Sequence, residues 1–140
     1  CASRVAAVTD WLAHDTRAGS LPIGYFGAST GAAAALLAAA RRPERVQAVV
    51  SRGGRPDLAG AQLQQVHAPT LLIVGGHDPE VLQLNRLAQR ELGSKTTLTI
   101  VPGATHLFEE PGALDAVIAS AIEWFVEHLT GAPVGQSLGW

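Results

Sequence analysis

Short apolar segments alternate with amphipathic helical segments along most of the chain, and this alternation restricts the fold more than any other feature. Residues 21–26, 46–51 and 70–74 are largely apolar runs of strand length, and residues 96–101 alternate as a strand does. Strands that alternate with helices form βαβ units, whose right-handed crossovers build a parallel sheet. The run 70–74 is almost continuously apolar, as a strand buried on both faces requires. The sequence therefore predicts an α/β fold, a parallel sheet with helices on both faces.

Five helical segments accompany these four strands. Apolar residues recur at helical spacing from the start of the chain to near Gly19, and an alanine-rich helix over 32–42 is stopped by Pro43. Further helices are expected over 58–66 and 80–92. A long final helix is marked by the apolar residues Leu114, Val117, Ile118, Ala121, Ile122, Phe125 and Leu129. We expect residues 1–130 to form one domain, followed by a glycine- and proline-containing tail over 131–140.

Composition excludes several classes of partner and setting. The 140 residues are 47% hydrophobic, enough for one core, and the net charge of −2 provides no basic patch for nucleic acid. No segment reaches the roughly 20 apolar residues that cross a bilayer, so no membrane association is expected. Cys1 is the only cysteine, which excludes an intrachain disulfide and favours a cytoplasmic setting. Because the chain opens on Cys1 and enters a helix at once, we expect it to be part of a longer protein.

The segment Gly27-Ala28-Ser29-Thr30-Gly31 lies between a predicted strand and a predicted helix. This is the context of a G-x-S-x-G nucleophile elbow, in which a strained turn presents the serine. Small residues on either side avoid collisions in so tight a turn. The helix that starts there directs free N–H groups at developing negative charge, so the Thr30 N–H is the expected oxyanion donor. Taken alone, the serine is equally explained as a helix N-cap.

Two further residues strengthen the catalytic interpretation. Asp78 follows the third predicted strand, and His106 follows the fourth. Since reactive groups gather at the carboxyl ends of parallel strands, three loops would bring Ser29, Asp78 and His106 together. The chain order serine, acid, histidine is that of α/β-hydrolases. His106 would take the serine proton, and Asp78 would hold the imidazole in the required tautomer.

Other residues compete for these roles. Asp78 precedes Pro79 and is equally typical of a turn that caps a helix, and His106 taken alone is a surface loop histidine. Asp57, after the second strand, is the rival acid, and His77 is a weaker rival base. The remaining imidazoles are interpreted as structural or exposed, and the acids before the last helix as its solvent-facing start; these residues are His14, His67, His128, Glu109 and Glu110.

The sequence motifs do not indicate a cofactor site. The sequence contains no H-E-x-x-H and no cluster with metal-ligand spacing, so no metal is expected. Gly24, Gly27 and Gly31 do not have the spacing of a dinucleotide-binding G-x-G-x-x-G. We therefore expect a cofactor-independent protein.

Four segments of the chain carry a family resemblance: residues 24–32, 50–57, 69–78 and 101–108. Together they resemble the dienelactone hydrolase branch of the α/β-hydrolases, in particular the bacterial hydrolase portion fused to phosphoribosyltransferase-like domains. The resemblance spans most of residues 1–130. It implies hydrolysis of a small ester-like substrate with Ser29, Asp78 and His106 as the triad. Dienelactone hydrolases use a cysteine nucleophile, so Ser29 implies a substrate other than dienelactone.

The resemblance also implies that this chain corresponds to the C-terminal half of an eight-stranded fold. The loop with the second oxyanion N–H would then lie outside the sequence, and the first strand would have an unpaired edge. We therefore expect a homo-oligomer or association with an N-terminal portion. A non-catalytic assembly fragment and an acyltransferase with the same triad are the alternative functions. Arg52 and Arg55 near the crevice are either solvated or recognise a substrate carboxylate.

Overall fold

The computed structural model describes residues 2–129, so Cys1 and the predicted tail over 131–140 lie outside the described part of the chain. Within it, four strands and five helices follow one another in the predicted order, and one helix is of the 3-10 type. The elements are α1 (Ala2–His14), β1 (Ile23–Ala28), α2 (Thr30–Arg41), β2 (Val46–Arg52), η1 (Pro56–Gln65), β3 (Thr70–Gly75), α3 (Pro79–Glu91), β4 (Thr96–Val101) and α4 (Ala113–Leu129).

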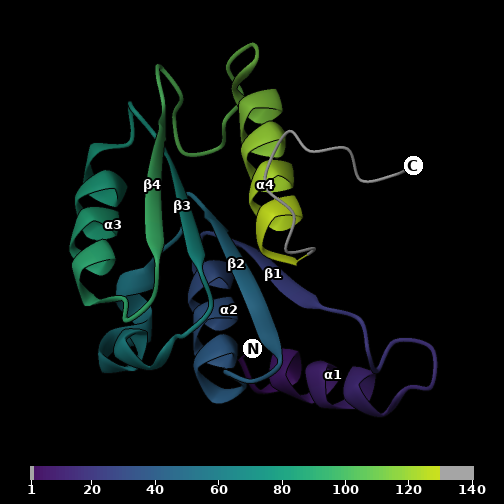
Figure 1. Cartoon of the computed structure of the whole chain (residues 1–140). Helices are drawn as coiled ribbons and strands as arrows, with labels where there is room; N and C mark the ends of the chain where they lie inside the picture. The colour runs from purple at the N-terminus through teal and green to yellow at the C-terminus, as the bar shows by residue number, and fades with distance from the viewer. Residues whose placement is uncertain (1, 130–140) are drawn as a thin grey trace.

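The four strands form one parallel sheet in the order β1-β2-β3-β4 (Figure 1). Each neighbouring pair is parallel, with Ala28 opposite Arg52, Arg52 opposite Ile73 and Gly75 opposite Val101. The carboxyl ends of the strands therefore lie along one edge of the sheet. The loops that leave this edge after β1, β3 and β4 carry the three residues for which the sequence predicts a catalytic role.

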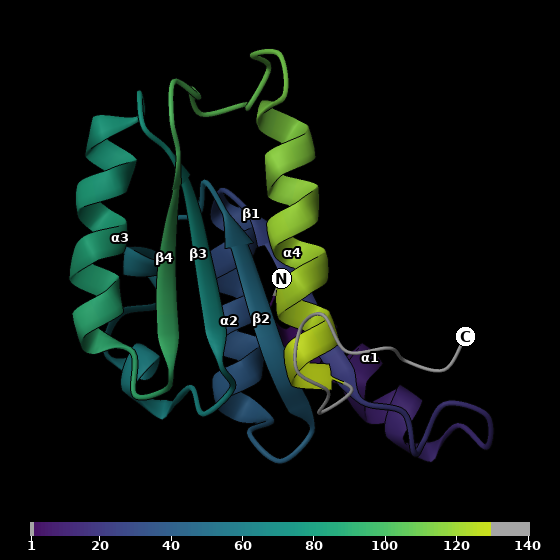
Figure 2. The same cartoon turned by 45° about the horizontal axis from the view of Figure 1, so that its top comes forward.

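Helices cover both faces of the sheet, which confirms the predicted architecture (Figures 1 and 2). One core lies between the sheet and α1, α2, η1 and α3, and contains Leu36, Val49 and Leu72, which are almost fully buried. The second core lies beneath α4, where Val50, Ile73 and Val117 meet. Strand β3 is buried along its whole length, as its apolar sequence requires.

The first helix is shorter than the helical spacing predicts, because it ends at His14 instead of near Gly19. The carboxylate of Asp15 accepts hydrogen bonds from the N–H groups of Arg17 and Ala18, at 2.8 and 3.1 Å. Aspartate side chains stabilise turns in this way and compete with helix continuation. The chain consequently turns toward β1 directly after the helix.

Helix α4 carries two apolar stripes rather than one. Ala113, Val117, Ala121 and Trp124 are buried against the sheet. Leu114, Ile118 and Ile122, which belong to the same helical pattern, have exposed fractions of 50, 49 and 57%. The second stripe is thus an exposed apolar surface within residues 2–129.

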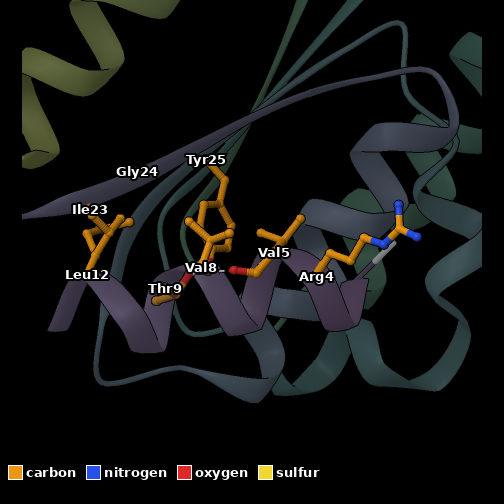
Figure 3. Close-up of a pocket in the computed structure, with 8 residues that line it drawn as sticks. All are labelled: Arg4, Val5, Val8, Thr9, Leu12, Ile23, Gly24 and Tyr25. Atoms are coloured by element: carbon orange, nitrogen blue, oxygen red, sulfur yellow. Dashed lines mark hydrogen bonds between the residues drawn. The ribbon is translucent and has the colours of Figure 1, made fainter. Parts of the chain in front are cut away.

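Strand β1 pairs only with β2 among the described residues, so its other edge is open. A groove of about 390 Å³ runs between α1 and the first part of β1, with Val5, Val8, Leu12 and Ile23 on its walls (Figure 3). Phe26, farther along the same strand, is also exposed, with an exposed fraction of 51%. No helix within residues 2–129 has the length and apolar character needed to cross a membrane.

Candidate active site

Ser29 stands on a sharp turn between β1 and α2. Its φ is 50° and its ψ is −123°, a region that residues other than glycine rarely occupy. A Cβ at Gly27 would lie 2.6 Å from the Gly31 carbonyl oxygen and 2.7 Å from Ala32 Cα, so only glycine fits before the serine. At Gly31 a Cβ would meet no atom of the described residues within 4 Å. The prediction that a side chain would collide there is therefore wrong for Gly31.

Helices α2 and α3 begin directly after the predicted site residues Ser29 and Asp78, but the side chains of these residues do not cap them. Ser29 occupies the N-cap position of α2, and Asp78 occupies that of α3, but neither side chain makes a capping hydrogen bond. Helix N-caps usually satisfy the first free N–H groups with such side chains. The N-cap interpretation therefore fails for both side chains, which are directed elsewhere. Thr30 is the first residue of α2, where an N–H has no partner within its own helix.

His106 joins the serine and the acid. Its Nε2 lies 2.8 Å from Ser29 Oγ, and its Nδ1 lies 2.8 Å from Asp78 Oδ2. A carboxylate can only accept, so Nδ1–H donates to Asp78 and Nε2 is free to accept the serine hydroxyl proton. The Asp78 side chain is 15% exposed, whereas that of His106 is 39% exposed. The structure thus brings together the three residues that the sequence places on separate loops.

The loop after β4 holds His106 through contacts on both sides of it. Glu110 accepts hydrogen bonds from the N–H and the hydroxyl of Thr105, at 2.9 and 2.7 Å. The Thr105 hydroxyl, together with backbone N–H groups, lowers the pKa of the Glu110 carboxyl. Phe108 has a φ of 55° and is 2% exposed, so its ring anchors the far side of the loop. His106 therefore stands between two anchored positions.

Neither rival residue reaches this arrangement. Asp57 is bound by Arg55, whose Nε and Nη2 lie 3.0 and 2.8 Å from its two carboxylate oxygens. His77 is exposed, and its N–H donates to the Ala104 carbonyl at 2.9 Å. His14 contacts the backbone of its own helix, and His128 lies against Trp124 with ring centroids 4.2 Å apart. Among the described residues, the imidazole that is hydrogen-bonded to Ser29 is that of His106.

The two arginines near the crevice differ in their partners. Arg55 is neutralised by Asp57, which raises the pKa of its guanidinium. The guanidinium of Arg52 lies 5.4 Å from the centroid of the Phe108 ring. Its Nε is buried and has no hydrogen-bond partner among the described residues. Of the two, Arg52 is the one without an acidic partner in this part of the chain.

Two residues that support the site were not found from the sequence. Glu110 precedes α4, which begins at Ala113, and its carboxylate binds Thr105. Asn85 is completely buried in α3 and donates to the Gly54 carbonyl at 3.0 Å. Asn85 lies at helical spacing from Ala88 and Leu92, which are both buried. This spacing was the available sequence signal that Asn85 is buried as well. A polar residue in register with apolar ones marks a buried polar contact.

Comparison with known proteins identifies the family and the fold of the chain. The family model described as "Dienelactone hydrolase family" matches residues 1–128. The crystal structure of a dienelactone hydrolase from Anabaena variabilis superposes with a TM-score of 0.90 at 59% identity, covering 91% of this chain and 59% of that chain. A dienelactone hydrolase-like promiscuous phosphotriesterase, P91, from metagenomic libraries has a TM-score of 0.71 at 19% identity, covering 91% of this chain and 61% of its own, and shares the fold.

A curated protein of Mycobacterium tuberculosis (strain H37Rv), named "Putative phosphoribosyl transferase Rv0571c", is 62% identical over 130 residues. The match covers 93% of this chain and 29% of that protein, so the chain spans less than a third of its relative. The phosphoribosyl transferase name describes that longer protein, and its pairing with a hydrolase-like segment agrees with the fusion that the resemblance implied. The match over residues 1–128 shows that the chain belongs to the dienelactone hydrolase family.

Proposed function

We propose that this chain is a serine hydrolase, or the part of one that carries the triad, and that it cleaves ester-like bonds of small acyl substrates. Ser29 is the proposed nucleophile, His106 the general base and Asp78 the acid that orients it. The hydrogen bonds from Ser29 Oγ to His106 Nε2 and from His106 Nδ1 to Asp78 Oδ2, both 2.8 Å, carry the proposal. Membership of a hydrolase family supports it.

The proposed reaction proceeds in two halves. Ser29 Oγ attacks the substrate carbonyl while His106 Nε2 takes its proton, and Asp78 stabilises the resulting imidazolium. The tetrahedral intermediate collapses as His106 returns the proton to the leaving alcohol, which leaves an ester on Ser29. Water then attacks this acyl-enzyme with His106 as base, and the acid product departs as Ser29 regains its proton. No cofactor takes part in either half.

The oxyanion would be stabilised by the Thr30 N–H at the start of α2. This N–H lies in the first helical turn, where unpaired donors and the helix dipole favour negative charge. By resemblance to the family, a second donor comes from polypeptide outside this sequence. We propose that the donor pair forms in the longer protein. The isolated chain would then turn over slowly, and its serine would still react with a strong electrophile.

The substrate is proposed to be small and openly accessible, in the bacterial cytoplasm. The segment between β2 and β3 is occupied by the short helix η1 and leaves no room for a large covering domain. Turnover at an open site depends on the acyl group, because little else of the substrate would be enclosed. We therefore expect short acyl esters to be preferred over long ones.

Covalent labelling tests the nucleophile directly. The chain is incubated with a fluorophosphonate and weighed, alongside Ser29→Ala and, as a matched control, Ser20→Ala in an exposed loop. We expect one adduct on wild type and on the control, and none on Ser29→Ala. A panel of p-nitrophenyl esters, assayed on the same proteins, identifies the acyl preference. Absence of both an adduct and ester turnover from wild type would instead favour a non-catalytic assembly role.

A further inference from the structure

The loop Arg52–Arg55 begins at the last residue of β2 and is hydrogen-bonded to both the N–H and the carbonyl of Ser29. The Ser29 N–H donates to the Arg52 carbonyl at 3.2 Å, and the Arg55 N–H donates to the Ser29 carbonyl at 3.0 Å. Both backbone groups of the serine are thus held by this one loop. Because Ser29 has a positive φ, its conformation depends on such outside contacts.

The same loop also lies against the histidine. Gly53 has a φ of 52°, and a Cβ there would be 3.4 Å from His106 Nδ1. The Gly53 N–H donates to the Ile73 carbonyl of β3 at 2.7 Å. At Gly54 a Cβ would lie 2.1 Å from Ser51 Oγ, so the loop passes through this place only as bare backbone. A shift of Arg52–Arg55 would therefore displace Ser29 and change the contact with His106 together.

Asn85 is the side chain that connects this loop to α3. It is completely buried, and its Nδ2 donates to the Gly54 carbonyl at 3.0 Å and to the Val81 carbonyl at 2.8 Å. Helix α3 begins at Pro79, directly after Asp78. One amide thus links the helix that starts at the acid to the loop that holds the nucleophile.

The contacts of Asn85 leave one of its own polar atoms unsatisfied. Asn85 Oδ1 is buried and has no hydrogen-bond partner among the described residues. A buried acceptor without a partner destabilises a fold, and such exceptions call for an explanation. An apolar side chain of similar size would remove this penalty, but it would also remove the donor to Gly54.

We infer that Asn85 is a positioning residue for the serine, histidine and acid. Its amide keeps the loop Arg52–Arg55 in register with α3, so that Ser29 stays aligned with His106 and Asp78. This inference rests on the proposed function for its effect on turnover. The attachment of the loop itself is a property of the fold, and it is measurable without catalysis.

The test compares Asn85→Leu with Gln89→Leu, a matched control one turn later on α3. Gln89 Nε2 donates to the Thr96 carbonyl at 3.4 Å, at the start of β4 and away from the site. For Asn85→Leu we expect kcat on a p-nitrophenyl ester to fall by about 10- to 100-fold, since a displacement on the order of 1 Å can cost that much. KM should not change, and Gln89→Leu should keep the wild-type kcat.

Amide hydrogen exchange supplies the second readout. Peptides covering Arg52–Arg55 should exchange faster in Asn85→Leu, with unchanged exchange in the sheet, and Gln89→Leu should match wild type. If Asn85→Leu does not fold, Asn85→Ser replaces it, because a serine can bond back to Val81 but cannot reach Gly54. Wild-type exchange and wild-type kcat in a folded Asn85 variant would overturn the inference. If wild type gives neither a fluorophosphonate adduct nor ester turnover, the proposed function fails, and exchange alone decides on Asn85.

Discussion

Arg55 holds the carboxylate of Asp57 with two parallel hydrogen bonds, from Nε at 3.0 Å and from Nη2 at 2.8 Å. The guanidinium lowers the pKa of the Asp57 carboxyl, and both oxygens of the carboxylate face Arg55. Within residues 2–129 no arginine or lysine is paired with Asp78, and its Oδ2 faces His106 Nδ1. The two candidate acids therefore differ in partner, and only Asp78 is placed to orient the imidazole.

The first prediction follows from this difference. Asp78→Asn should lower kcat for ester hydrolysis by up to about 10⁴-fold, because an amide can hold the imidazole in the wrong tautomer. Asp57→Asn should leave kcat near the wild-type value, since it alters only the pair with Arg55. Steady-state kinetics on one p-nitrophenyl ester, with folding checked by circular dichroism, makes the comparison. A larger loss in Asp57→Asn would reverse the assignment of the acid.

A second prediction concerns the backbone strain at Ser29. Ser29→Gly and Ser29→Ala both remove the hydroxyl, but glycine alone accepts a φ of 50° without strain. Ser29→Gly should therefore be more stable than Ser29→Ala by about 1 kcal/mol, and both should be inactive. Urea unfolding provides the measurement.

The exposed Ser20 serves as the reference for this pair, because positive φ among non-glycine described residues is confined to Ser29 and Phe108. At position 20, where the backbone is not strained, Ser20→Gly should be no more stable than Ser20→Ala. An equal stability of the two Ser29 variants would show that the turn is not strained in solution.

The third prediction uses the ionisation of Glu110. Its pKa is lowered because its carboxylate accepts two hydrogen bonds from Thr105. A carboxyl whose pKa is lower in the folded state stabilises the fold above its ordinary pKa, and this contribution disappears as the pH falls through the folded-state pKa. Wild type should therefore melt at a higher temperature than Glu110→Gln at neutral pH, and the difference should shrink below about pH 4.

Melting curves of both proteins across this pH range test the sign. Glu109→Gln is the control, because Glu109 is exposed and makes no side-chain hydrogen bond among the described residues. Its melting temperature should follow wild type at every pH. A difference between wild type and Glu110→Gln that persists unchanged in acid would contradict the role of ionisation.

A fourth prediction distinguishes two glycines. A Cβ at Gly75 would lie 2.2 Å from the Ala104 carbonyl oxygen, so the loop that carries His106 would have to move. Gly75→Ala should cost about 1–3 kcal/mol of stability and reduce ester turnover. A Cβ at Gly31 meets nothing within 4 Å, and alanine favours the helix, so Gly31→Ala should not lower stability. Equal unfolding midpoints for the two variants would be the contrary result.

The order of elements could be predicted because its signals are local. The alternation in residues 96–101 predicts β4 with the bounds that the structure has. Ser29, Asp78 and His106 could be placed at one sheet edge because parallel strands bring their carboxyl ends together. Local pattern failed where side chains bind distant or competing backbone, as Asp15 does when it ends α1 early.

The supporting residues could not be predicted for the same physical reason. Glu110 lies five positions after Thr105, and only the path of the loop brings the two together. Asn85 is separated from Gly54 in the sequence by η1, β3 and the first turn of α3, and nothing near either residue specifies that contact. The apolar residues that mark α4 divide between a buried and an exposed stripe, and the sequence could not predict this division because periodicity identifies apolar stripes but not what covers them.

The last prediction concerns what covers the open edge of β1. Unpaired backbone groups along such an edge form hydrogen bonds with any strand that comes close. Apolar surface lies on both sides of it: the groove against α1 on one side, and on the other the exposed Phe26 together with Phe125 of α4, which lies against Gly24. A strand added here would be buried on both faces, which favours an apolar one such as β1 itself.

In a preparation of the 140-residue chain, we propose that the occupant is a second copy, paired through β1. Light scattering at micromolar concentration should give twice the monomer mass of 14.5 kDa. Phe26→Lys should shift the protein toward monomer, because the pairing would bury a charge. Leu87→Lys, which changes a residue that is 55% exposed on α3, is the matched control and should remain a dimer. A well-folded wild-type monomer would refute pairing between copies, and the edge would then be free for polypeptide of a longer protein.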